Sequence, residues 1–409
     1  HILSDRCFAC HGPDANKRES GYRLDIQEDA YKALKDKPDV FGIVPGHSDQ
    51  SAVVDRINST DPNLVMPPPT SNLSLTAREK ELIIKWIDQG AEWKKHWSFI
   101  PLASVALPEP NTDWGHNEVD QFVARKFEEK GFTPSEQATR NRLLRRMSFD
   151  LTGLPPSEDL RLDFLANNAM SYEDLIDELM KSPAYGEHMA TTWLDLARYS
   201  DSHGYQDDLE RIMWPWRDWV ISAYNRKLPY DQFVTWQLAG DLLPNATKEQ
   251  ILATGFNRNH NITQEGGVID EEYRIEYVTD RANTFGKAFL GLTTECAKCH
   301  DHKYDPISQK DYFSLFSFFN SVPEKGRIEY DEIPEPNIEI TDEDLQGILS
   351  FINAENFKGE KLKVMVMADS MAKRPSYVLN RGQYDLHGDP VSENTPVAIK
   401  AFDQQYSRD

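Results

Sequence analysis

One five-residue motif occurs twice in this chain and sets the strongest limit on what the chain can fold into. Cys7-Phe-Ala-Cys10-His11 returns as Cys296-Ala-Lys-Cys299-His300, and the two copies use all four cysteines of the 409 residues. C-x-x-C-H is the attachment signal for a c-type haem, in which the thiols form thioethers and the histidine binds the iron. The sequence therefore predicts two covalent haem c groups, each with its own pair of cysteines and a proximal histidine: Cys7, Cys10 and His11, then Cys296, Cys299 and His300.

Two other interpretations of the cysteine pairs stay open. Four thiolates could share a zinc ion, but the pairs would have to meet across most of the chain and both histidines would be unexplained. Two disulfides could form in an oxidising compartment, although a CxxC disulfide does not require a following histidine. The zinc alternative is stronger for the second motif, because Asp301, His302 and Asp305 add further metal ligands beside it.

The charge of the chain limits its partners. There are 45 Lys and Arg against 67 Asp and Glu, which gives a formal net charge of −22 at pH 7. Such a charge repels nucleic acid and anionic lipid, and it suits a protein that meets ions or cationic partners. No stretch approaches the roughly 18 consecutive apolar residues of a membrane-spanning helix. We therefore expect no nucleic-acid partner and no membrane span.

Residues 1–95 are typical of a small cytochrome c-like haem domain. The first motif is followed by a long loop, and a capping box at Thr76-Ala-Arg-Glu79 then predicts a helix that stops near Gly90. This helix has an apolar stripe that we expect to face the core, at Leu82, Ile83, Trp86 and Ile87.

Met66, in Met66-Pro67-Pro68-Pro69, is the candidate distal ligand of the first iron. It lies in a stiff proline-rich loop, and a thioether opposite a histidine raises the reduction potential of the iron. A lone methionine more often packs in a core. His47, in Pro45-Gly46-His47, is the rival ligand.

The sequence pattern after residue 95 divides into three regions. Residues 96–115 contain three prolines and predict a linker, and residues 116–325 show a mainly helical pattern around the second motif. Residues 326–409 predict short strands, and we expect this β-rich tail to open a further domain. The expected fold is mainly α: a cytochrome c-like domain, a larger helical domain and the β-rich segment.

The elements expected in these two regions can be stated by residue range. Examples of the expected helices are Val119–Lys130, Ala138–Asp150, Tyr172–Lys181, His188–Tyr199, Arg217–Arg226, Glu271–Leu290 and Lys310–Asn320. The strands are Val364–Met367 and Tyr377–Asn380, and the turns are Arg381-Gly382 and His387-Gly388-Asp389-Pro390.

Several longer motifs lie in residues 1–95 and 116–325. The first 95 residues hold Cys7–Asp14, Val44–His47, Met66–Pro69 and Trp86–Trp93. In this they resemble the planctomycete-type cytochrome c domain. Residues 116–325 resemble the large helical domain of unknown function that is usually fused behind it, on the evidence of Asp150–Pro156, Trp193–Ser202, Trp214–Val220, Gln237–Pro244, Ala253–His260 and Cys296–Pro306. The resemblance implies a secreted or periplasmic haem protein, typical of Planctomycetes and associated with polysaccharide-degrading repertoires, without a settled reaction.

His260 occupies the position within these motifs that we favour as the distal ligand of the second iron. A histidine in such a polar loop more often forms hydrogen bonds than binds a metal. His203 and His188 are the alternative ligands. A further alternative is an open distal site at which peroxide or another small molecule binds the iron.

Three functions are consistent with these sites. The first is di-haem electron transfer with a redox partner protein or a small-molecule electron carrier, with oxidoreductase chemistry coupled at the second haem. The second is an enzyme, either peroxidase-like or acting on a saccharide. The third is a single-haem cytochrome joined to a metal-binding or interaction module. Covalent haem attachment takes place outside the cytoplasm, so we expect a periplasmic or extracellular protein whose signal peptide the sequence does not include.

Overall fold

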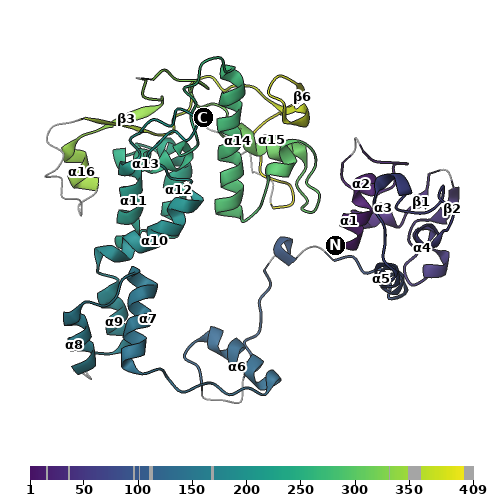
Figure 1. Ribbon diagram of the computed structural model, residues 1–409, viewed down its shortest axis with the longest axis horizontal. Helices are drawn as coiled ribbons and strands as arrows, with labels where there is room; N and C mark the ends of the chain where they lie inside the picture. The colour runs from purple at the N-terminus through teal and green to yellow at the C-terminus, as the bar shows by residue number, and fades with distance from the viewer. Residues whose placement is uncertain are drawn as a thin grey trace. The chain divides into compact units, whose positions relative to one another are not determined.

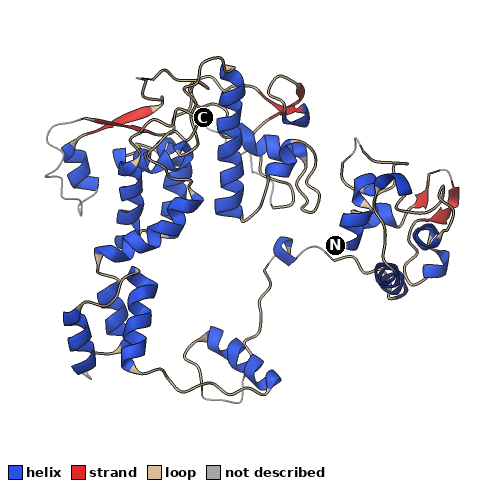
Figure 2. Cartoon of the chain, viewed as in Figure 1, coloured by secondary structure: helices blue, strands red, loops and turns tan. Residues whose placement is uncertain are grey.

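The computed structural model describes residues 1–14, 17–35, 37–94, 97–100, 102–109, 114–166, 170–330, 332–348 and 361–399. The chain is 48% helix and only 8% strand, which confirms the expected mainly α fold (Figure 2). It divides into two compact units, each built from separate stretches of sequence. The first unit combines His1–Ile100, Gly267–Val322 and the stretch from Asp369 onward, and the second combines Pro101–Gly266 with Pro323–Ala368.

By residue range, the first unit contains both CxxCH motifs. Figure 1 labels most of its helices and strands. Its N-terminal stretch forms α1 (Ile2–Arg6), α2 (Phe8–His11), α3 (Gln27–Ala30), β1 (Ala33–Leu34), β2 (Lys37–Phe41), η1 (Ser48–Gln50), α4 (Ala52–Asn58), η2 (Pro69–Ser71), α5 (Ala77–Asp88) and η3 (Trp97–Phe99). Its later stretches form α14 (Asp270–Phe285), the π-helical turn η6 (Gly286–Leu290), η7 (Glu295–Lys298), α15 (Gln309–Ser317), β5 (Ser376–Leu379), η9 (Asn380–Gly382) and β6 (His387–Val391).

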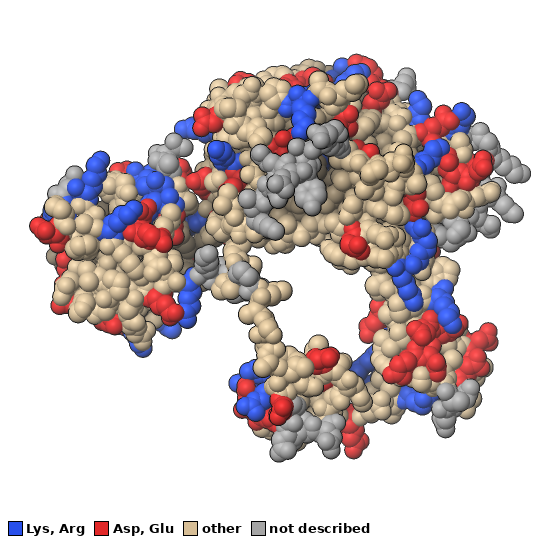
Figure 3. Space-filling model, turned by 180° about the vertical axis from the view of Figure 1, so that it is seen from behind, with Lys and Arg blue, Asp and Glu red and all other residues tan. Residues whose placement is uncertain are grey.

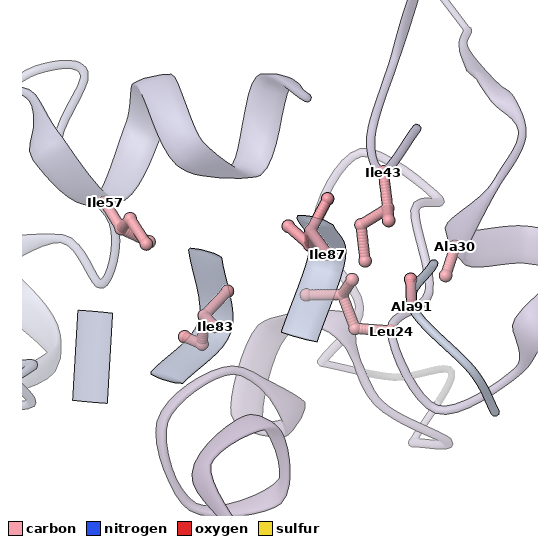
Figure 4. Packing of buried hydrophobic residues seen from close by; sticks show 7 residues of the cluster. All are labelled: Leu24, Ala30, Ile43, Ile57, Ile83, Ile87 and Ala91. Atoms are coloured by element: carbon pink, nitrogen blue, oxygen red, sulfur yellow. The ribbon is translucent and has the colours of Figure 1, made fainter. Parts of the chain in front are cut away.

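Residues 1–94 pack around a small apolar core. The cluster consists of Leu24, Ala30, Ile43, Ile57, Ile83, Ile87 and Ala91 (Figure 4). Burying one aliphatic side chain of this size stabilises a fold by about 1.5–3 kcal/mol. Helix α5 is the main contributor, because Ile83 and Ile87 lie one turn apart on the face that meets the core.

The second unit is mostly helical. Its elements are α6 (Glu118–Lys130), α7 (Arg140–Thr152), α8 (Glu158–Ala166), α9 (Tyr172–Leu179), α10 (Pro183–Leu196), α11 (Trp214–Asn225), α12 (Tyr230–Ala239), η4 (Gly240–Leu242), α13 (Lys248–Ala253), η5 (Thr254–Arg258), β3 (Asn337–Ile340), α16 (Asp342–Ile348) and β4 (Leu362–Met365). Aromatic side chains form part of its core, and Trp219 stacks on Phe233 with ring centroids 5.6 Å apart.

The described strands form three two-stranded antiparallel sheets. β1 pairs with β2, β3 with β4, and β5 with β6. Two of these sheets lie in the C-terminal segment, where the sequence predicted strands. The sequence analysis did not predict the β1–β2 hairpin.

The helix predicted behind the capping box is confirmed as α5. Thr76 Oγ1 accepts a hydrogen bond from the Glu79 amide, and the Glu79 carboxylate accepts one from the Thr76 amide. The helix ends at Asp88, just before Gly90, whose φ of +99° suits glycine. The expected burial of Leu82 is wrong: this side chain is 47% exposed, because it lies about 100° around the helix from Ile83.

The helices predicted between residues 116 and 325 are present, with shifts at their ends. The predicted helix at His188–Tyr199 begins earlier, because Pro183 occupies the first turn of α10, where a proline costs no hydrogen bond. Helices α8, α12 and α13 also lie in the region that the sequence predicts to be mainly helical, outside the ranges named as examples. The predicted turn at His387–Pro390 is wrong: these residues form strand β6, and the two-stranded sheet tolerates Pro390 because each strand is an edge strand.

No helix in the described part of the chain combines the length and apolarity that crossing a membrane requires. Acidic and basic side chains are interspersed over the face shown in Figure 3. The proposed boundaries of the linker, the helical domain and the further C-terminal domain remain predictions.

Candidate haem sites

The first CxxCH motif lies at the junction of two short helices. Cys7 separates α1 from α2, and His11 is the last residue of α2. The amides of Cys10 and His11 donate to the Cys7 carbonyl at 3.1 and 2.8 Å. This turn places both thiols and the imidazole on one short stretch of backbone.

The ring of His11 is oriented by a backbone carbonyl. Nδ1 lies 3.1 Å from the carbonyl oxygen of Tyr22, and the two rings meet edge to face at 5.7 Å. Because a carbonyl can only accept, Nδ1 carries the proton in this contact and the lone pair is left on Nε2. This is the tautomer that a histidine needs to bind a metal through Nε2.

A cavity of about 200 Å³ opens beside this histidine. Its lining brings together the sulfur and imidazole groups of Cys7, Cys10, His11 and Met66 with mainly apolar neighbours. Met66 is held there by its own amide, which donates to the Arg56 carbonyl at 3.1 Å. His47, the rival ligand, is exposed and is not among the residues that line the cavity.

The electrostatics of the cavity suit a bound haem. Burial, with a smaller contribution from neighbouring Cys10, raises the pKa of the Cys7 thiol to about 11. Arg6 and Arg56 also line the cavity, and arginine pairs well with carboxylates such as haem propionates. The donor set, the tautomer of His11 and the apolar lining therefore fit a c-type haem.

The second CxxCH motif has the same backbone turn in a different setting. It begins on η7 and continues past its end, and the amides of Cys299 and His300 donate to the Cys296 carbonyl at 3.3 and 3.4 Å. Both cysteines and His300 are exposed. His300 Nδ1 lies 2.7 Å from the carbonyl oxygen of Asp301, which again leaves Nε2 for a metal.

His302, beside this motif, is only 5% exposed and organises the following turn. Its Nδ1 accepts hydrogen bonds from the amides of Tyr304 and Asp305, at 3.2 and 2.8 Å. The proton of the neutral ring is therefore on Nε2. No group of three or more His, Cys, Asp or Glu side chains that could hold a metal ion is found among the described residues.

His260 is buried in the second unit, whereas His300 belongs to the first. Its Nδ1 lies 2.9 Å from the Asn261 carbonyl oxygen, and its Nε2 lies 3.9 Å from Glu324, which also pairs with Arg258. The role of His260 as a distal ligand remains a prediction.

The alternatives to His260, His203 and His188, belong to the same unit. Burial, helped by the charge of Arg211, lowers the pKa of His203 to about 4, so this imidazole is neutral at pH 7.

Sequence reasoning missed the part that Tyr22 plays. Its carbonyl orients His11, its hydroxyl donates to the Ala30 carbonyl at 2.8 Å, and its ring leaves no room for a side chain at Gly42. A backbone acceptor has no sequence signature.

Fold and site together define a c-type cytochrome domain at the N-terminus, and comparison with family models agrees. Residues 7–70 match the Planctomycete cytochrome C model. Residues 118–324 match PSCyt2, described as a protein of unknown function (DUF1549). Because the second match covers half of the chain, the protein belongs to this PSCyt2 family, with the cytochrome domain fused ahead of the family segment. Comparison with the curated proteins and with the solved structures gives no match.

Proposed function

We propose that this protein transfers electrons outside the cytoplasm through two c-type haems, one at each CxxCH motif. The observation that carries the proposal is the cavity whose lining includes Cys7, Cys10, His11 and Met66. A haem bound there supplies one-electron exchange at its iron.

The residues of the cavity perform distinct tasks. The two thiols would hold a haem covalently, and the Tyr22 carbonyl keeps His11 turned so that Nε2 is available. Met66 offers a thioether donor, which favours a high reduction potential. The apolar lining excludes water, and a dry apolar site disfavours the extra positive charge of oxidised iron. The lining therefore also favours the reduced state of a bound haem.

The second motif supports a second haem of a more accessible kind. Its thiols and imidazole are exposed, so a haem attached there would be open to solvent on the motif side. Such a site suits exchange with a small-molecule carrier or a redox partner protein. The net charge of −22 favours a cationic partner surface.

The same exposure supports a second candidate function, oxidoreductase chemistry on a small molecule at this haem. Uptake of cyanide by the oxidised protein, seen as a spectral change of one haem only, would support it. Two low-spin irons that take up no added ligand in either oxidation state would contradict it.

Covalent haem count tests the main proposal. Protein matured outside the cytoplasm is analysed by intact mass and by its reduced pyridine haemochrome spectrum, with a Cys296→Ser/Cys299→Ser double variant as the control. We expect two haems in the natural sequence and one in the variant. A single haem in both would reduce the helical part to a binding module attached to a cytochrome.

A further inference from the structure

Gly382 lies directly against the second motif, although 82 residues of chain lie between it and Cys299. It sits in the turn between β5 and β6 with a φ of +73°, a conformation that favours glycine. A Cβ atom built on Gly382 would stand 3.2 Å from Cys299 Sγ and 2.9 Å from Cγ of Lys298. Both distances are shorter than ordinary van der Waals contacts.

The neighbouring Lys298 is not free to move aside. Its ammonium group pairs with Glu276 of α14 at 2.6 Å, and its side chain is 18% exposed. A methyl group at position 382 would therefore press on the Cys299 sulfur as well as on a fixed lysine stem.

The side-chain amide of Gln309 connects the second motif to the hairpin formed by strands β5 and β6. Gln309, at the start of α15, donates through Nε2 to the carbonyls of Lys298 and Leu379, at 2.9 and 3.2 Å. Its backbone amide donates to Asp301 at 2.8 Å. One residue thus links the motif, the segment after it and strand β5.

The hairpin carries a rigid aromatic pair of its own. The rings of Tyr377 and His387 stack with centroids 4.7 Å apart and planes 7° from parallel. Leu379 pairs with His387 across the two strands. This segment lies outside residues 118–324, so the family match does not include it.

We propose that the β5–β6 hairpin is one wall of the second haem site, and that glycine at position 382 leaves Cys299 Sγ the space it needs to form its thioether. The proposal rests on the proposed function, since it assumes a haem at this motif. In that reaction the thiol adds across a vinyl double bond. An S–C bond replaces the S–H bond and the hydrogen goes to the adjacent carbon, so no oxidant or reductant is consumed.

The first test compares Gly382→Ala with Gly291→Ala in the full chain matured outside the cytoplasm. Gly291 is a matched control, because its φ is +64° and nothing lies within 4 Å of the Cβ it would gain. Peptide mass mapping after alkylation of free thiols counts the thioethers at Cys296 and Cys299 separately. We expect Gly382→Ala to lose the Cys299 thioether several-fold more often, while Cys296 and the first haem keep theirs.

A second pair of variants tests the contact between the β5–β6 hairpin and the second motif while keeping Gly382. Gln309→Glu replaces the amide donor with a carboxylate that faces two carbonyl oxygens, whereas Gln383→Glu makes the same change at an exposed position of the hairpin. We expect only Gln309→Glu to reduce attachment at the second motif. Heat-induced unfolding of both variants shows whether the loss is local.

The outcomes separate the two proposals. If the natural sequence carries no haem at Cys296 and Cys299, the di-haem function and the hairpin proposal both fall. If it carries two haems, but Gly382→Ala matches Gly291→Ala and Gln309→Glu matches Gln383→Glu, only the hairpin proposal falls.

Discussion

The two CxxCH motifs share one backbone turn and differ in everything around it. In both, the amides of the second cysteine and the histidine donate to the carbonyl of the first cysteine, and Nδ1 of the histidine faces a carbonyl oxygen. The first motif borders a cavity shared with Met66, while the second has exposed cysteines and an exposed histidine. The motif thus predicts where a haem would attach, and the surroundings would determine how enclosed its iron is.

The surroundings of the two motifs differ because the residues that form them come from different parts of the chain. All residues that line the first cavity fall between positions 6 and 73, so one small domain supplies the whole site. The second motif is contacted by Gln309 and by Gly382, which come from separate parts of the chain. We therefore expect the first site to depend on its haem for stability more strongly than the second.

Removing both thioethers from each motif in turn should give the largest contrast. A Cys7→Ser/Cys10→Ser variant that lacks its haem leaves a cavity of about 200 Å³. At ~24 cal/mol per Å³ this costs up to roughly 5 kcal/mol of unfolding free energy. The Cys296→Ser/Cys299→Ser variant changes exposed positions and should cost about 0.5 kcal/mol. Urea unfolding measures the loss of unfolding free energy in each double variant, and limited proteolysis reports on residues 1–94. Equal losses in the two variants would contradict the proposed difference between the two sites.

Met66→Ala should separate the two haems electrochemically. Loss of the thioether donor removes a ligand that raises the potential, so we expect the first reduction wave to fall by roughly 0.2 V, within the ≈ 0.8 V that axial ligands span. The second wave should stay where it is. Met371→Ala is the control, because that side chain is fully exposed. Voltammetry in which both methionine variants behave alike would remove Met66 from the first site.

In protein without attached haem, the rate of thiol labelling should be lower for the more buried Cys7 than for the exposed Cys296. The pKa of Cys7 is raised from 9.0 to about 11, so at pH 8 its thiolate is about 100-fold scarcer than that of an unshifted thiol. Its labelling rate should rise about tenfold per pH unit until the pH reaches that pKa. The exposed Cys296 should react first. Equal rates for Cys7 and Cys296 at pH 8 would show that the first motif is not enclosed.

Local patterns in the sequence predicted the local parts of this structure. The capping box of α5 and the seven helical periodicities depend on residues a few positions apart, and each produced an element close to its predicted place. Strand β6 failed as a prediction because Gly388 and Pro390 are turn residues by composition, while pairing with β5 makes them a strand.

The same limit applies to the sites. The cysteines and histidines could be named because C-x-x-C-H is contiguous in the sequence. Tyr22 orients His11 through a backbone carbonyl, which leaves no pattern in the sequence. The Arg381-Gly382 turn could be predicted from its residues, but the proximity of Gly382 to Cys299 could not. Contacts of this kind become visible only when distant segments are packed together.

Two matched helix caps, one near each motif, should give small effects of similar size. Thr76 caps α5, whose Glu79 also holds Arg6 of α1 at 3.2 Å, and Ser308 caps α15 just after the second motif. Each change to alanine removes the side-chain acceptor for one backbone amide at the start of a helix and should cost about 1 kcal/mol. Thr76→Ala should lower the unfolding midpoint followed at the first haem, and Ser308→Ala should lower the midpoint followed at the second.

Because the caps serve different helices, the Thr76→Ala/Ser308→Ala double variant should lose the sum of the two unfolding free energies within about 0.5 kcal/mol. A larger deviation, measured by urea unfolding at both haem absorbances, would mean that the two motifs are energetically coupled and that their contrast is not a property of separate surroundings.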